Sequence, residues 1–83
     1  LIWKALPDAE LMPEAEKLAR HLATQPTQAL GLIKQAIQAS TGHSLDGQLD
    51  LERDLQREAG RTADYREGVA AFLAKRPPAF QGK

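Results

Sequence analysis

The sequence predicts an all-α fold of about four short amphipathic helices that follow a short strand remnant. Apolar residues recur at intervals of three and four residues in four stretches, which is the periodicity of a helix with one apolar face. Short segments containing Pro, Gly or small polar residues separate these stretches. Capping and stop residues stand where the stretches begin and end, so their boundaries agree with their periodicity.

The first residues, Leu1 to Leu6, form a short apolar run that Pro7 ends. Such a run is typical of the end of a strand. Trp3 lies within it, and we expect this side chain to be a core residue rather than stacked on a ligand.

The first helix is predicted from about Ala9 to Thr24, with Asp8 as its N-cap. Pro13 lies near its start, so the regular helix is expected to begin there. His21, near the end, has no set of metal ligands around it and is interpreted as a surface residue. The apolar face consists of Leu11, Ala15, Leu18 and Leu22.

The second helix is predicted from Thr27 to Ala39, with Pro26 able to serve as its first residue. Gly31 costs about 1 kcal/mol relative to Ala inside a helix, so a packing contact is a reason for its presence. Lys34 is interpreted as a solvated charge. The apolar stripe consists of Leu30, Ile33 and Ile37, widened by Ala29, Leu32 and Ala36.

The third helix is predicted from about Leu45 to Glu58, capped by Ser44 and ended by Gly60. Its acidic and basic side chains recur at three- and four-residue spacing, and we expect most of them to form solvated pairs. The apolar stripe consists of Leu45, Leu49, Leu51, Leu55 and Ala59.

The fourth helix begins at Thr62, whose hydroxyl can accept a free backbone N–H. Asp64 and Glu67 place negative charge near the positive end of the helix dipole. The predicted face of this helix consists of Tyr65, Val69, Phe72, Leu73 and Arg76. The predicted end consists of two cations in the last turn and two prolines that forbid continuation, Lys75, Arg76, Pro77 and Pro78.

Length and composition exclude several classes of protein. The chain has 83 residues and no cysteine, so it forms one small domain at most and has no disulfide, thiolate nucleophile or cysteine-bound zinc. Eleven basic and eleven acidic residues cancel, which argues against nucleic-acid binding. No apolar run reaches the ~20 residues of a membrane span and no signal peptide is visible, so a cytoplasmic location is expected.

No catalytic or metal-binding set can be assembled from this sequence. Glu52 and Glu58, or Asp50 and Asp54, can share a helix face, but nothing encloses them in an apolar pocket that would shift their pKa values. His43 is only the sequence neighbour of a serine, which is not a catalytic geometry. No phosphate-binding glycine loop and no zinc-ligand spacing is present.

One segment resembles a known family. The residues from Asp64 to Lys83 follow the pattern Asp-x-x-Glu-Gly-x-x-Ala-Phe-x-x-Lys-Arg-x-Pro-x-Phe-x-Gly, which is similar to the C-terminal signature of the crotonase (enoyl-CoA hydratase/isomerase) superfamily. Two upstream runs, Leu30 to Ile37 and Leu49 to Arg57, resemble the helices that precede this signature. The resemblance covers nearly the whole chain.

The resemblance implies that residues 1–7 are the end of a core-domain strand and that residues 8–83 are a C-terminal helical oligomerisation region. The chain does not begin with Met, and we expect it to be part of a longer enzyme. Within the superfamily the similarity is greatest to isomerases of phenylacetate degradation, which convert a ring epoxide to an oxepin. The oxyanion hole and acidic catalytic groups of these enzymes lie upstream, so this segment alone is expected to be inactive.

The resemblance also implies a binding role. In the superfamily a Phe and a Lys of the last helix approach coenzyme A, and the matching positions here are Phe72 and Lys75. An aromatic face can stack on adenine and an ammonium suits a phosphate, and residues at i and i+3 share a helix face. Without the resemblance, the favoured interpretations are a plain core aromatic for Phe72 and a helix C-terminal charge for Lys75. No separate cofactor is expected, because the coenzyme A thioester is the substrate.

The expected partners are acyl-CoA and further copies of the same protein, as a trimer or a dimer of trimers. The residues expected to be covered by the core domain or by a neighbour are Leu30, Ile33, Ile37, Leu49, Leu55, Val69 and Leu73. Two alternatives stay open. One is the same region of an enoyl-CoA hydratase, and the other is a stand-alone helical protein-interaction module.

Overall fold

The computed structural model describes residues 2–83 and contains four helices in that range, α1 (Asp8–Ala23), α2 (Thr27–Ser40), α3 (Leu45–Ala59) and α4 (Ala63–Ala74). The predicted all-α class and the number of helices are confirmed. Helix boundaries agree with the prediction to within two residues at most places, which is the usual scatter of helix ends.

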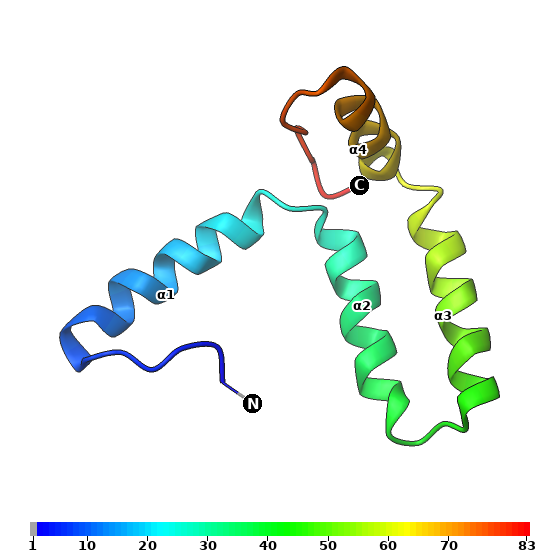
Figure 1. Ribbon diagram of the computed structural model, residues 1–83, viewed down its shortest axis with the longest axis horizontal. Coiled ribbons are helices and arrows are strands. Elements are labelled where there is room, and N and C mark those ends of the chain that lie inside the picture. Colours follow the sequence, from blue (N-terminus) through cyan, green and yellow to red (C-terminus); the bar gives the residue numbers. More distant parts are fainter. Residues whose placement is uncertain (1) are drawn as a thin grey trace.

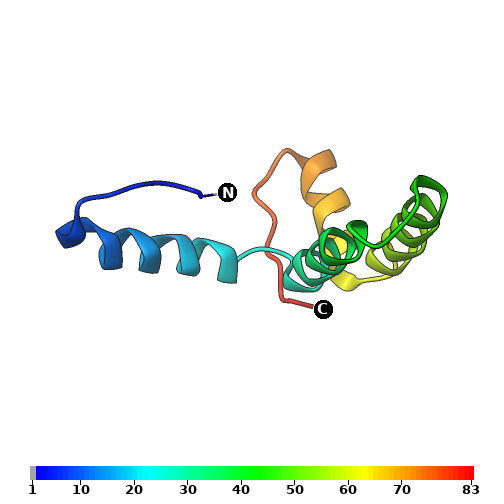
Figure 2. The ribbon, with the colours of Figure 1, turned by 90° about the horizontal axis from the view of Figure 1, so that it is seen from below.

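The helices do not close around a common core. α2 and α3 lie side by side as an antiparallel pair, α4 crosses above their ends, and α1 points away from the other three (Figure 1). Seen along its edge the molecule is thin, with α1 and the N-terminal segment forming a separate arm (Figure 2). The radius of gyration is 16.0 Å, whereas a compact chain of this length would have about 12 Å. The apolar helix faces therefore lack cover within this chain.

The N-terminal segment differs from the prediction. Residues 2–7 form no strand, and Leu1 lies outside the described residues. A strand needs a neighbour to pair with, and residues 2–83 supply none to this segment. It lies instead over α1, where Lys4 Nζ is 3.1 Å from Glu14 Oε1. Trp3 is 83% exposed rather than buried, so a core role for it would require atoms from outside this chain.

α1 begins earlier than its proline suggested. Asp8 is already helical, Pro7 precedes the helix as its cap residue, and no side chain caps the end, so the assignment of Asp8 as N-cap is wrong. Pro13 is the sixth residue of the helix, where it removes the bond to the Ala9 carbonyl without ending the helix. No residue of α1 is buried.

α2 and α3 pack against each other as a pair. Leu55 of α3 is 8% exposed, and Gln48 Nε2 donates a 3.0 Å hydrogen bond across the pair to the Ala36 carbonyl. Ser44 caps α3 as predicted, accepting a bond of 3.2 Å from the Gly47 N–H. Gly31 faces open space, so no neighbour within 4 Å in the described residues explains this glycine.

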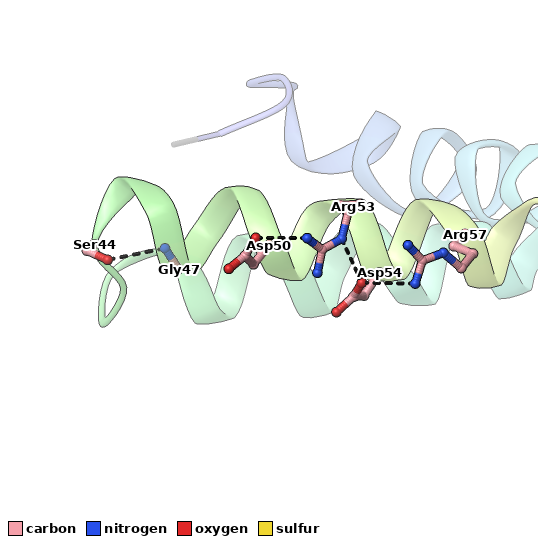
Figure 3. A network of polar contacts seen from close by, with 6 residues as sticks. All are labelled: Ser44, Gly47, Asp50, Arg53, Asp54 and Arg57. Carbon is pink, nitrogen blue, oxygen red and sulfur yellow. Dashed lines mark hydrogen bonds and ion pairs between the residues drawn. The ribbon is translucent and has the colours of Figure 1, made fainter.

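The charges of α3 form two pairs at the predicted three-residue spacing and a third between sequence neighbours. Arg53 bonds both Asp50 and Asp54 at 3.0 Å, and Arg57 lies 3.4 Å from the same Asp54 carboxylate (Figure 3). All four side chains are more than half exposed, so the ladder is a solvated surface feature worth little stability.

α4 ends in a Schellman motif. Thr62 caps its start, accepting a 3.0 Å bond from the Tyr65 N–H, as predicted. At its end Lys75 is left-handed, with φ 53° and ψ 42°, and the N–H groups of Lys75 and Arg76 donate to the carbonyls of Phe72 and Ala71. The prediction that Lys75 and Arg76 form the last turn is therefore wrong. The helix stops at Ala74, and both cations follow it.

Candidate functional site at the C-terminal end of α4

The chain after α4 folds back along the helix toward its start (Figure 1). We call this segment, residues 77–83, the tail. Asp64, in the first turn of α4, is its main anchor: Oδ1 accepts a 2.7 Å bond from the Gln81 N–H and Oδ2 a 2.7 Å bond from the Gly82 N–H. The Asp64 N–H in turn donates to the Lys83 carbonyl at 2.7 Å. Asp64 is only 3% exposed, and these partners satisfy its buried carboxylate.

Glu67 is the second anchor. Its carboxylate accepts two bonds from the Arg76 guanidinium, at 2.6 and 3.0 Å, and a 2.9 Å bond from the Ala79 N–H. The hydrogen bonds from Arg76 and from the Ala79 backbone lower the pKa of Glu67 from 4.5 to about 2. We call these three residues, Glu67, Arg76 and Ala79, the latch, because they hold the chain on both sides of the two prolines.

The last part of the tail meets two other elements. The Phe80 ring lies over Gly68, where an added methyl carbon would be 3.5 Å from it. Gly82 has φ +77°, and a Cβ atom there would lie 2.8 Å from Thr27 Oγ1 at the start of α2. Only glycine adopts this backbone readily, and only a residue without a Cβ atom fits this close to Thr27. Gly82 therefore lets the tail pack against the start of α2.

The structure explains several residues of the C-terminal signature described in the sequence analysis. Its Asp, its Glu and its final Gly hold the tail, and Ala71 is buried, being 1% exposed. Sequence reasoning missed this because it treated Asp64 and Glu67 only as charges near a helix N-terminus. Apart from the Arg76 side chain, their partners are backbone groups up to 18 residues away, and backbone groups have no residue type to recognise.

Phe72 and Lys75, the predicted coenzyme A residues, lie beside this latch. Phe72 is 82% exposed and lines an apolar concavity between α4, the tail and the ends of α2 and α3. The other lining residues include Pro26, Ala29, Tyr65, Val69, Leu73 and Phe80. Lys75 is exposed at the left-handed position. The expectation that they share a helix face through i and i+3 spacing is wrong, since Lys75 is outside the helix.

Phe72 is not a core aromatic within the described part of this chain, because its side chain is exposed. The charge of the neighbouring Arg76 is paired with Glu67. Of the two adjacent cations, Lys75 is therefore the one without a carboxylate within 4.0 Å among the described residues.

Among the described residues the other ionisable groups form no reactive cluster. His43 Nδ1 lies 3.1 Å from the side-chain oxygen of Gln48, and Glu52 accepts a bond from the same Gln48. In residues 2–83 no three His, Cys, Asp or Glu side chains come together as metal ligands would. Within the same range, every helix is too short or too polar to cross a bilayer.

The apolar faces that were expected to need a partner are largely open. Leu55 is covered within the chain and Leu30 is partly covered. The remaining five are between 44% and 75% exposed: Ile33, Ile37, Leu49, Val69 and Leu73. Two of them, Ile33 and Ile37, line a groove between α2 and α3. Patches of this kind mark surfaces that contact another molecule.

Comparison with known proteins decides the family. The model of the enoyl-CoA hydratase/isomerase family matches residues 1–83. The chain belongs to this family. Among its relatives, the 1,2-epoxyphenylacetyl-CoA isomerase of Escherichia coli K12 is 65% identical over 83 residues, 100% of this chain and 32% of that protein. A probable enoyl-CoA hydratase of Rhodobacter capsulatus is 47% identical over 83 residues, with the same shares covered.

Solved structures of the family contain the same arrangement of helices. An enoyl-CoA hydratase from Geobacillus kaustophilus matches with a TM-score of 0.89 and 36% identity, over 94% of this chain and 30% of that one. A second structure from the same organism matches with a TM-score of 0.86 and 44% identity, over 90% of this chain and 29% of that one. The chain thus spans about a third of the length of the relatives that it matches.

Proposed function

We propose that this chain is the C-terminal helical region of a crotonase-type acyl-CoA isomerase that converts ring 1,2-epoxyphenylacetyl-CoA to the oxepin-CoA form. In this proposal residues 1–7 close the core domain and residues 8–83 supply oligomer contacts and part of the coenzyme A site. The observation that carries the choice of activity is the 65% identity to an isomerase over the whole chain, against 47% to a probable hydratase. The catalytic groups lie outside this segment.

The open shape supports a role as part of a larger body. Ile33, Ile37 and Leu73 are each more than half exposed, although each is a large apolar side chain. Exposing such groups to water is unfavourable by about 1.5–3 kcal/mol for each fully exposed side chain. A core domain or a neighbouring subunit that covered these faces would recover that free energy, as expected for a trimer or a dimer of trimers.

The coenzyme A contact is proposed at Phe72 and Lys75. The exposed Phe72 ring offers a face for the adenine, and the free Lys75 ammonium offers a charge for a phosphate. The left-handed backbone supports a functional reason for the lysine. A residue with a Cβ atom costs about 1–2 kcal/mol there, and glycine is the usual choice at this position of a Schellman motif.

The activity is tested on the full-length protein that contains this chain. The purified protein is given 1,2-epoxyphenylacetyl-CoA and, separately, a 2-enoyl-CoA, and the products are separated by chromatography. Formation of the oxepin-CoA with little hydration of the enoyl-CoA supports the isomerase. The reverse result would assign the chain to the hydratase alternative.

The contact is tested by the affinities of coenzyme A and 3′-dephospho-CoA for the same protein and for its Lys75→Ala variant. Losing one charge-assisted phosphate contact is expected to reduce the preference for coenzyme A by about tenfold. An unchanged preference would remove Lys75 from the site.

The stand-alone alternative is tested by the denatured and native masses of the chain with this sequence alone. An oligomeric native mass supports the proposed role of the open faces. A monomer that unfolds cooperatively would favour a self-sufficient interaction module.

A further inference from the structure

We infer that Glu67 is a positioning residue for the Lys75 ammonium and acts through Arg76 and Ala79. This inference rests on the proposed coenzyme A contact. Glu67 itself need not touch the ligand. Its role is to fix the direction in which the chain leaves α4, and thereby the place from which the Lys75 side chain extends.

The geometry constrains Lys75 from both sides. On the helix side, the N–H groups of residues 75 and 76 donate to the carbonyls of Phe72 and Ala71, which holds the left-handed turn. On the tail side, both oxygens of Glu67 bind the Arg76 guanidinium, at 2.6 and 3.0 Å. Bidentate pairing fixes the plane of the guanidinium as well as its distance, so the residue next to Lys75 is held in one orientation.

The Ala79 N–H extends this constraint past the prolines by donating to Glu67 Oε1 at 2.9 Å. Residues 76 and 79 are thereby held to one carboxylate, and the stiff Pro77-Pro78 pair lies between them. The segment that follows Lys75 is therefore anchored to the same helix from which Lys75 extends.

The latch also gives the two adjacent cations, Lys75 and Arg76, different roles. The Arg76 guanidinium is paired with the Glu67 carboxylate. The same hydrogen bonds hold the pKa of Glu67 at about 2, so the pair stays ionised at neutral pH. Lys75 keeps its ammonium free for an anionic ligand. Without Glu67, the Arg76 guanidinium and the Ala79 N–H lose their common anchor, and the direction in which the Lys75 side chain extends is no longer fixed from the tail side.

The test uses the full-length enzyme and two probes, coenzyme A and 3′-dephospho-CoA, whose dissociation constants are measured by calorimetry. Four variants are compared with the parent: Glu67→Gln, Arg76→Met, Lys75→Ala and the double variant Glu67→Gln/Lys75→Ala. The matched control is Asp54→Asn, which also breaks an exposed carboxylate–arginine contact but lies on α3, away from the tail. Circular dichroism and native mass show which variants keep the fold and assembly.

We expect Glu67→Gln and Arg76→Met each to reduce the preference for coenzyme A over 3′-dephospho-CoA by at least about threefold, and Asp54→Asn to leave it unchanged. In the Lys75→Ala background the Glu67 substitution should have no further effect on this preference, because it acts through Lys75. A merely structural role would weaken both probes equally, in both backgrounds.

Two outcomes overturn the inference. In the first, Lys75→Ala lowers the preference but neither latch variant does, and then the coenzyme A contact stands while the positioning role fails. In the second, Lys75→Ala itself leaves the preference unchanged, and then the proposed contact fails and the positioning role fails with it. If Glu67→Gln does not fold, the result for Arg76→Met alone decides whether the positioning role holds. This variant leaves the Glu67–Ala79 bond in place.

Discussion

The Oδ2 atom of Asp64 accepts a 2.7 Å hydrogen bond from the backbone N–H of Gly82, 18 residues later in the chain. The other carboxylate oxygen binds the neighbouring Gln81 N–H at the same distance. Through this pair of residues the tail is closed onto the first turn of α4. Because Phe72 and Lys75 lie between the two residues that this contact joins, its stability bears directly on the proposed coenzyme A site.

Asp64→Ala is expected to destabilise the chain by about 2–3 kcal/mol. The substitution leaves two backbone N–H groups without their charged acceptor in part-buried bonds, which is the costly way to lose a hydrogen bond. Urea unfolding measures the loss, and hydrogen exchange should accelerate at the amides of Gln81 and Gly82.

Asp46→Ala is the matched control for that substitution. Asp46 occupies the same position in α3, two residues after the capping serine, but it is exposed. Its removal should cost only the dipole contribution of about 0.5 kcal/mol. Equal effects of the two substitutions would contradict an anchoring role for Asp64.

Gly82→Ala is expected to lower stability by about 1–2 kcal/mol. The φ of +77° is unfavourable for any residue with a Cβ atom, and that atom would approach Thr27 Oγ1. Thermal unfolding of the Gly82→Ala and Gly82→Ala/Thr27→Ala variants separates the two causes. The double variant relieves the approach but keeps the backbone strain, so only part of the stability should return.

Gly31→Ala should act in the opposite direction. Gly31 is a helical glycine with nothing within 4 Å of its missing side chain, so alanine should stabilise α2 by about 1 kcal/mol in the isolated chain. The same substitution in the full-length protein reports on the face of α2. If stability or native mass falls there, another domain or subunit packs against Gly31. If Gly31→Ala raised stability both in the isolated chain and in the full-length protein, packing would not explain the presence of glycine at this position.

Stability should fall as the solution is acidified through the range in which Glu67 takes up a proton. Its pKa is 4.5 as the ordinary value and about 2 in the folded chain, so the unfolded chain binds the proton first. The stabilisation by the latch is complete above pH 4.5, is lost as the pH falls toward about 2, and does not change further below that. Thermal midpoints recorded across this range should decline less in Glu67→Gln than in the parent. Parallel curves would show that the carboxylate contributes nothing to the acid response.

Lys75→Gly is expected to raise the thermal midpoint while weakening coenzyme A binding in the full-length protein. Glycine removes the cost of the left-handed backbone, about 1–2 kcal/mol, and it also removes the ammonium. Lys75→Ala separates these effects, since it loses the ammonium but keeps the strained backbone. A midpoint for the glycine variant no higher than that for alanine would mean that the backbone at residue 75 is not strained.

Local signals in the sequence determined the helices of this protein. Ser44 and Thr62 cap helices because a side-chain oxygen at that position can reach a free N–H two or three residues on, and no distant partner is needed. The ion pairs of α3 follow from spacing alone for the same reason. The final segment likewise resembled one family before any fold was known, and the family match over residues 1–83 agrees with it.

Only the tertiary structure decided what the helices and the tail do with one another. The two anchors of the tail, Asp64 and Glu67, bind backbone groups and an arginine that are far along the chain, and no periodicity reports such partners. The loss of a free charge at Arg76 follows from its pairing with Glu67. In the N-terminal segment, a structure expected from the sequence does not form. Its residues read as a strand, but a strand requires hydrogen-bonding partners that residues 2–83 do not give it.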